Sequence, residues 1–137
     1  MSTQALGKPV EILLGEDNPG DVRLTREALK DGKINEALAY ANRAIGRTPG
    51  HSDFLDTRGV IYLAAGQPHL ALDDLQKAVA IDPLSALKNF HLARAFLANN
   101  DKEKAKQTLK AAQAKGLTQN SLDALEQPSY QSFLKEL

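Results

Sequence analysis

The residues best suited to metal chemistry are two neighbouring carboxylates, Glu16 and Asp17, which follow an apolar block at residues 10–14. Carboxylate oxygens are the ligands that a hard cation such as Mg²⁺ prefers, but such an ion takes several oxygen ligands. This pair alone does not make a site. A metal site would require further acidic residues, brought to the pair by other parts of the fold.

No other arrangement of side chains predicts catalysis. His51, His69 and His91 share no metal-ligand spacing, and the Ser and Thr residues have no His or Lys base at a recognisable spacing. The sequence has no Cys, which excludes thiolate chemistry and disulfides. The glycines of GEDNPGD do not have the spacing of a nucleotide-binding fingerprint. We therefore expect no catalytic residue, no metal and no cofactor, and hence no enzyme.

Length and charge narrow the class of protein further. A chain of 137 residues is long enough for one domain with a real core. Lys and Arg together number 17, as do Asp and Glu, so nothing suggests nucleic acid or an anionic membrane as a partner. The apolar block at residues 10–14 is too short for a signal peptide or a membrane span. We expect a soluble, cytoplasmic protein.

Similar residues recur at intervals of 34 along the chain. Small residues recur where two helices would cross closely, and Gly or Asn recurs where a helix would stop. Pro recurs after the second helix of a unit, which it prevents from continuing. The matching sets are Leu29, Leu63, Leu97; Gly32, Gly66, Asn100; Ala37, Ala71, Ala105; Ala44, Ala78, Ala112; and Pro49, Pro83, Leu117.

The middle unit, residues 52–85, resembles a tetratricopeptide repeat at Gly59, Tyr62, Gly66, Ala71, Leu75, Ala78 and Pro83. The third unit, residues 86–119, also fits, with departures at Asn100 and Leu117. Residues 120–137 resemble the capping helix of such arrays; we expect Pro128 to break this helix and Ser129 to cap its second part. The resemblance implies an all-α solenoid of about three helical hairpins over residues 18–119, closed by the cap.

The segment VEILLGEDNPGDVRLTREALKDGK, residues 10–33, is similar to the first strand, acidic loop and first helix of a response-regulator receiver domain. In that family Glu16 and Asp17 would help to hold Mg²⁺. No later strand offers a phospho-accepting Asp, so we do not expect phosphorelay chemistry. Asn18 and Pro19 can start a helix that completes a first repeat. We interpret the chain as a chimera with a receiver-like tail at residues 1–17, of natural or engineered origin.

Tetratricopeptide arrays usually bind peptides on a concave face lined by the first helix of each repeat. The resemblance therefore implies a peptide-binding groove made of Arg26, Lys30, Asp56, Val60, Phe90, Arg94 and Leu97. The family's carboxylate clamp does not carry over, because Arg26 and Val60 replace its Asn residues. The cations Arg26, Lys30 and Arg94 would still suit an acidic peptide through charge-assisted hydrogen bonds.

Three functions follow, in descending order. The first is a non-enzymatic protein–protein interaction module that binds a protein or peptide in the groove. The second is a chimeric scaffold without a ligand, which forms a homodimer through the adhesive apolar strand at residues 10–15. The third is a residual signalling domain that responds to Mg²⁺ or acyl phosphate.

Overall fold

The computed structural model describes residues 19–137, and their side chains from Arg23 onward. The chain divides into two compact units, Met1–Pro49 and Gly50–Leu137, and each is described by itself. The expected strand at residues 10–14, the acidic pair Glu16 and Asp17, and the proposed dimer segment at residues 10–15 lie outside the described residues.

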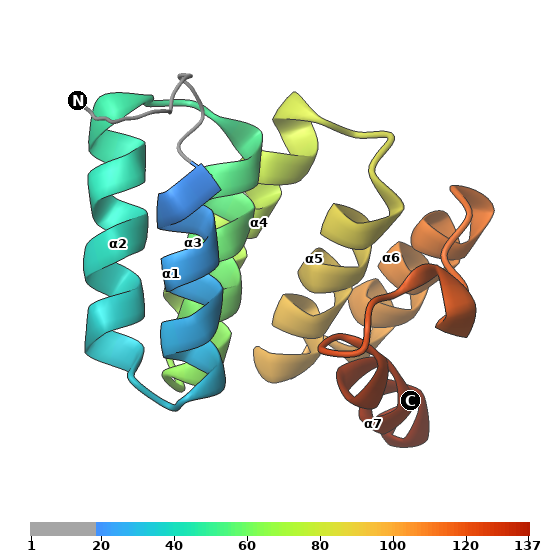
Figure 1. Ribbon diagram of the computed structural model, residues 1–137. Helices are drawn as coiled ribbons and strands as arrows, with labels where there is room; N and C mark the ends of the chain where they lie inside the picture. Colours follow the sequence, from blue (N-terminus) through green and yellow to red (C-terminus); the bar gives the residue numbers. More distant parts are fainter. Residues whose placement is uncertain (1–18) are drawn as a thin grey trace. The chain divides into compact units, whose positions relative to one another are not determined.

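The described part of the first unit is one helical hairpin, formed by α1 (Pro19–Lys30) and α2 (Ile34–Arg47) (Figure 1). Gly32 makes the turn with a positive φ of 77°, a conformation that glycine adopts without steric cost. The amide of Lys33 donates to the carbonyl of Ala28 at 2.8 Å, which closes the end of α1. The buried face of α2 repeats every three or four residues, at Ala37, Ala41 and Ala44.

The second unit consists of two helical hairpins, a short 3₁₀ turn and a last helix (Figure 1). The prediction of helical hairpins is confirmed, and no strand occurs in the part of the chain that the structure describes. None of the described helices is both long enough and apolar enough to cross a bilayer. The elements are α3 (Ser52–Ala64), α4 (Pro68–Ile81), α5 (Ala86–Ala98), α6 (Lys102–Ala114), η1 (Gln119–Ser121) and α7 (Gln127–Glu136).

The turns inside these hairpins have the expected left-handed residues. Gly66, between α3 and α4, has a φ of 72°, and Asn100, between α5 and α6, has a φ of 65°. Asn tolerates this region better than most side chains do, which explains why it can replace Gly at the third equivalent position. The amides of Gln67 and Asp101 donate back to Tyr62 and Phe96 carbonyls at 2.9 Å in the same way.

The core of the second unit holds small residues where helices cross and large ones between the layers. Phe90 has no exposed surface, and its ring packs edge-to-face on Tyr130 and Phe133 of α7, with centroids 5.4 and 5.7 Å away. Through these contacts α7 packs against α5. Other core residues are Ala71, Leu75, Ala93, Phe96, Ala105, Leu109, Ala112, Leu117 and Leu122.

The C-terminal segment differs from the single broken helix expected over residues 120–137. Thr118 and Ser121 form a capping box around η1, and the chain then runs through a turn into α7. Pro128 lies in the first turn of α7, so it begins the helix and does not break it, because an amide there needs no helical partner. Ser129 is therefore inside the helix, and the expectation that it caps a second piece is wrong; the N-cap is Glu126, without a side-chain cap.

The closest approach of α3 and α4 gives a stability prediction. A Cβ added to Gly59 would lie 2.5 Å from Cγ of Leu75, whose side chain is fully buried. We expect Gly59→Ala to lower the free energy of unfolding by about 1–2 kcal/mol, since overpacking outweighs the better helix propensity of Ala. Urea denaturation followed by circular dichroism measures this change.

The matched control is Gly46→Ala in α2, where an added Cβ meets nothing within 4 Å. This change should raise the free energy of unfolding by up to about 1 kcal/mol through helix propensity alone. Equal effects of the two substitutions would contradict the close crossing of α3 and α4.

Candidate functional site

Helices α3, α5 and α7 of the second unit line a groove of about 420 Å³. Its apolar surface comes from Leu, Ala, Phe and Pro side chains, and its charged groups are one Arg and one Glu. The lining residues are Leu63 of α3; Arg94, Leu97 and Ala98 of α5; and Pro128, Ser129, Ser132, Phe133 and Glu136 of α7. The groove therefore offers an apolar surface with isolated polar groups, which is the usual composition of a binding site.

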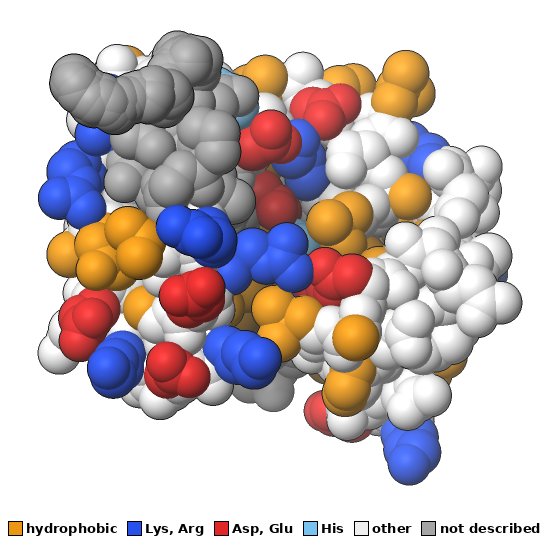
Figure 2. Space-filling view, viewed as in Figure 1, with side chains coloured by type: hydrophobic (Ala, Val, Ile, Leu, Met, Phe, Trp, Pro, Cys, Tyr) orange, Lys and Arg blue, Asp and Glu red, His pale blue; other side chains and the backbone are white. Residues whose placement is uncertain are grey.

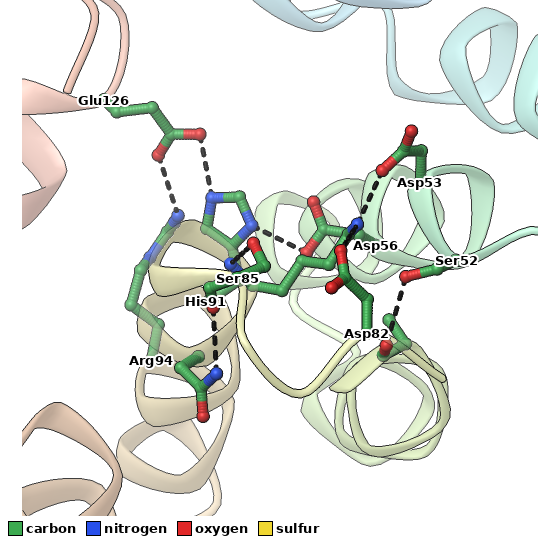
Figure 3. Close-up of polar contacts among 11 residues, drawn as sticks. Ser52, Asp53, Asp56, Asp82, Ser85, His91, Arg94 and Glu126 are labelled. Carbon is green, nitrogen blue, oxygen red and sulfur yellow. Dashed lines mark hydrogen bonds and ion pairs between the residues drawn. The ribbon is translucent and has the colours of Figure 1, made fainter. Parts of the chain in front are cut away.

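A buried histidine connects the same three helices (Figure 3). The Nδ1 atom of His91 on α5 lies 2.8 Å from Oδ1 of Asp56 on α3, and its Nε2 atom lies 2.8 Å from Oε2 of Glu126. Only 2% of His91 is exposed. A carboxylate accepts but does not donate, so both ring nitrogens must donate, which only the protonated imidazolium can do.

The electrostatics of the three residues agree with that geometry. Burial by itself would lower the pKa of His91, but the charge and hydrogen bond of Asp56, followed by those of Glu126, raise it to about 9. Burial would raise the pKa of Glu126, and this is outweighed by its hydrogen bond to His91 and by the charges of His91 and Arg94, which lower it. The histidine is therefore a cation and Glu126 an anion at neutral pH.

Arg94 is the cation of the groove, and its bonding is incomplete. Its Nη1 atom lies 3.8 Å from Oε1 of Glu126, which is beyond hydrogen-bond distance (Figure 3). Its guanidinium also lies over the ring of Phe90, 5.8 Å from the centroid. Among the described residues, Arg94 has no closer charged partner. Burial lowers its pKa against the opposing charges of Glu126 and Asp56, so a guanidinium rich in donors is held in a poorly hydrated place.

The remaining buried ion pairs of this unit tie helices together away from the groove lining. Arg58 forms two hydrogen bonds, of 2.7 and 2.8 Å, with Asp74 on α4. The Nζ atom of Lys88 lies 2.6 Å from Oδ1 of Asp53 and 2.7 Å from Oδ2 of Asp82. Each charge is paired, as buried charges require. Among the described residues, no group of three or more acidic or His side chains is arranged to hold a metal ion.

The structure brings only part of the predicted groove together. Arg94 and Leu97 line the groove, but Phe90 is fully buried against α7 and Asp56 is bonded to His91. Val60 is half-buried on α3 and does not line this groove. The prediction treated α5 as having an open face, whereas Phe133 and Tyr130 of α7 cover it at Phe90.

The two other predicted residues, Arg26 and Lys30, are exposed on α1 of the first unit. They therefore belong to a different compact unit from the groove that α3, α5 and α7 line. Their assignment to a common peptide-binding face stays a prediction.

Sequence reasoning missed His91, Glu126 and the contribution of α7 to the groove. A signal was present, because Asp56, His91 and Glu126 are separated by 35 residues each, about one repeat. An acid, a base and an acid at that interval occupy corresponding places in successive layers, where they can meet. The lining from α7 could not be found so simply, since Ser129 and Ser132 have no distinctive pattern.

Comparison with protein families explains the repeat. Two family models, each described as tetratricopeptide repeat, match residues 22–86 and residues 62–127, and together they extend over more than half of the chain. The chain belongs to the tetratricopeptide repeat family. This membership supports a protein–protein interaction module, in a family whose members are typically non-enzymatic. No curated protein gave a significant match.

Solved structures of tetratricopeptide proteins share the fold. The TPR domain of Sgt2 from Aspergillus fumigatus has a TM-score of 0.69 at 19% identity, covering 87% of this chain and 80% of that one. The type III secretion translocator chaperone SycD of Yersinia enterocolitica, in an alternative dimer, has a TM-score of 0.67 at 18% identity, covering 85% of each chain. SycD in complex with a peptide of the translocator YopD gives the same score and identity, with coverage of 85% and 86%.

The family match also bears on the origin of α1. Because the first model begins at residue 22, it includes most of α1 as part of a tetratricopeptide repeat. These matches give no support to a helix derived from a receiver domain or to a chimera. The receiver-like strand itself lies outside the described residues.

The bonding of His91 predicts how stability depends on pH. Its pKa of about 9 in the folded protein lies above the 6.5 of an unperturbed His. The stabilisation is therefore complete below about pH 6.5 and is lost as the pH rises to 9 and beyond, by an amount on the order of 3 kcal/mol. We expect the free energy of unfolding, measured by urea denaturation across this range, to fall accordingly.

Two variants isolate the contribution of His91. His91→Gln should remove most of the slope between pH 6.5 and 9, whereas His69→Gln, at an exposed position of α4, should leave it unchanged. Lys88, whose pKa is raised above 10.5 by Asp53 and Asp82 despite burial, affects stability only at higher pH. A full slope in His91→Gln would contradict the buried imidazolium.

Proposed function

We propose that this protein binds a peptide segment in the groove of α3, α5 and α7, and that the segment presents an apolar side chain together with a carboxylate. The observation that carries this proposal is the incomplete bonding of Arg94 at an apolar groove. A guanidinium has five N–H donors, and the one ion pair of Arg94 among the described residues, with Glu126, is 3.8 Å long.

The apolar part of the groove suits one or two aliphatic or aromatic side chains. Leu63 and Leu97 are half-buried and Ala98 is exposed, so apolar surface remains open between the helices. Covering that surface supplies the driving force for binding at about 25 cal/mol per Å². This contribution does not distinguish acidic from neutral peptides.

The carboxylate supplies the selectivity. A peptide carboxylate that reaches Arg94 makes charge-assisted hydrogen bonds, which are stronger than those between neutral groups. In the view of Figure 2, Lys and Arg side chains are interspersed with Asp and Glu, without a large area of one sign. Arg94 is the one cation among the residues that line the groove, so selectivity for an anion would come from this single guanidinium.

The comparisons support a peptide as the ligand class. The structure of SycD with a peptide of the translocator YopD shows that a protein of similar fold holds a peptide. At 18% identity that similarity concerns the fold alone, so the residues of the groove and the carboxylate preference rest on the geometry of this chain.

Selection from a displayed library of short random peptides tests the proposal. The wild-type chain should enrich peptides with Asp, Glu or a free C-terminus beside apolar residues. Arg94→Gln should weaken the binding of a selected peptide about tenfold or more, the usual value of a hydrogen bond to a charged group. Fluorescence of a Trp in the peptide reports binding, because the protein has no Trp of its own.

One further variant tests whether the peptide binds in this groove, and another serves as a control. Ala98→Glu puts a carboxylate on the exposed groove edge of α5, so it should reduce binding as strongly as Arg94→Gln does. Lys110→Gln removes an exposed cation of α6 outside the groove lining and should leave the affinity unchanged. If the library yields no peptide, or if Lys110→Gln weakens binding equally, the groove is not the site.

A further inference from the structure

His91 is not among the residues that line the groove, yet its position bears directly on Arg94. It is 2% exposed, and both of its ring nitrogens are bonded to carboxylates. One of those carboxylates, Glu126, also forms the ion pair with Arg94. The charge and bonding of His91 therefore determine how closely Glu126 can bond Arg94.

The two carboxylate oxygens of Glu126 contact different cations, and the contact with the histidine is the shorter one. Its Oε2 atom is 2.8 Å from Nε2 of His91, whereas its Oε1 atom is 3.8 Å from Nη1 of Arg94. A carboxylate and a guanidinium free to approach one another form two parallel hydrogen bonds. That arrangement is absent here: one oxygen of Glu126 is bonded to the ring, and the other forms only the longer ion pair with Arg94 (Figure 3).

We propose that His91 is a positioning residue that sets the preference of the groove for carboxylate-bearing peptides by keeping Glu126 from forming close hydrogen bonds with Arg94. This inference rests on the proposed peptide-binding function and adds the residue that tunes its selectivity. His91 itself does not touch the peptide.

The charges of these four side chains give the direction of the expected effect. Asp56 and Glu126 are balanced by the His91 imidazolium and by Arg94, so the group as a whole is neutral. Without the positive charge on residue 91, the group carries one excess negative charge. Glu126 is then free to bond Arg94, and both effects oppose a peptide carboxylate while leaving the apolar contacts of Leu97 in place.

The measured quantity is the ratio of two dissociation constants. One probe is the acidic peptide selected from the library, and the other is its twin with each carboxylate replaced by the amide. His91→Gln should reduce the preference for the acidic peptide about tenfold, close to the loss of one charge-assisted bond. Binding of the amide twin should change little, which separates a change of selectivity from damage to the groove.

Two rescues distinguish positioning from a merely structural role. His91→Lys keeps a cation between Asp56 and Glu126 and should retain most of the preference for the acidic peptide. Adding Glu126→Gln to His91→Gln should restore that preference, because the competing carboxylate is gone. If His91→Gln does not fold, Glu126→Gln alone decides: the preference should stay or rise, and a fall overturns the proposal.

The outcomes separate the two proposals. If the wild-type chain binds no peptide or binds both twins equally, the proposed carboxylate site at Arg94 fails. If the wild-type chain prefers the acidic twin and His91→Gln keeps the same preference, the site at Arg94 stands. In that case the role assigned to His91 is wrong.

Discussion

The charged bridge from Asp56 through His91 to Glu126 is the interaction on which the rest of the second unit depends. It lies between α3 and α5 at one ring nitrogen and between α5 and the start of α7 at the other, each at 2.8 Å. Burying charges is costly, and a buried ion pair often stabilises no more than packed apolar residues would. Its effect is directional, because each ring nitrogen needs a carboxylate at one place, and this restricts how the helices can be set against one another.

Apolar packing attaches α7 to α5 in addition to the charged bridge. Phe90 precedes His91 on α5 and is covered by Tyr130 and Phe133, while His91 is bonded to Glu126 just before α7. The last helix is therefore attached by rings on one side and by charge on the other. Because α7 also lines the groove, the same contacts that close the array shape the candidate binding site.

How far the sequence predicts this structure depends on whether a feature is local. The hairpins and the turns at Gly66 and Asn100 follow from periodicity and backbone preference within a few residues, and they were predicted. Pro128 was misjudged because the same residue can end one helix or start another, and local sequence does not choose. Phe90 and Asp56 were placed on an open face, since their burial depends on partners 35 or more residues away.

The way in which Arg94, Glu126, His91 and Asp56 are bonded follows from the stacking of repeats. In such an array each layer touches only its neighbours, so a charged side chain between layers has few partners and a fixed geometry. Arg94 can present its donors to the groove because Glu126 is already bonded to His91, and His91 is held in turn by Asp56 on the preceding layer. The chemistry offered to a ligand is thus set by buried side chains on or next to the helices that line the groove.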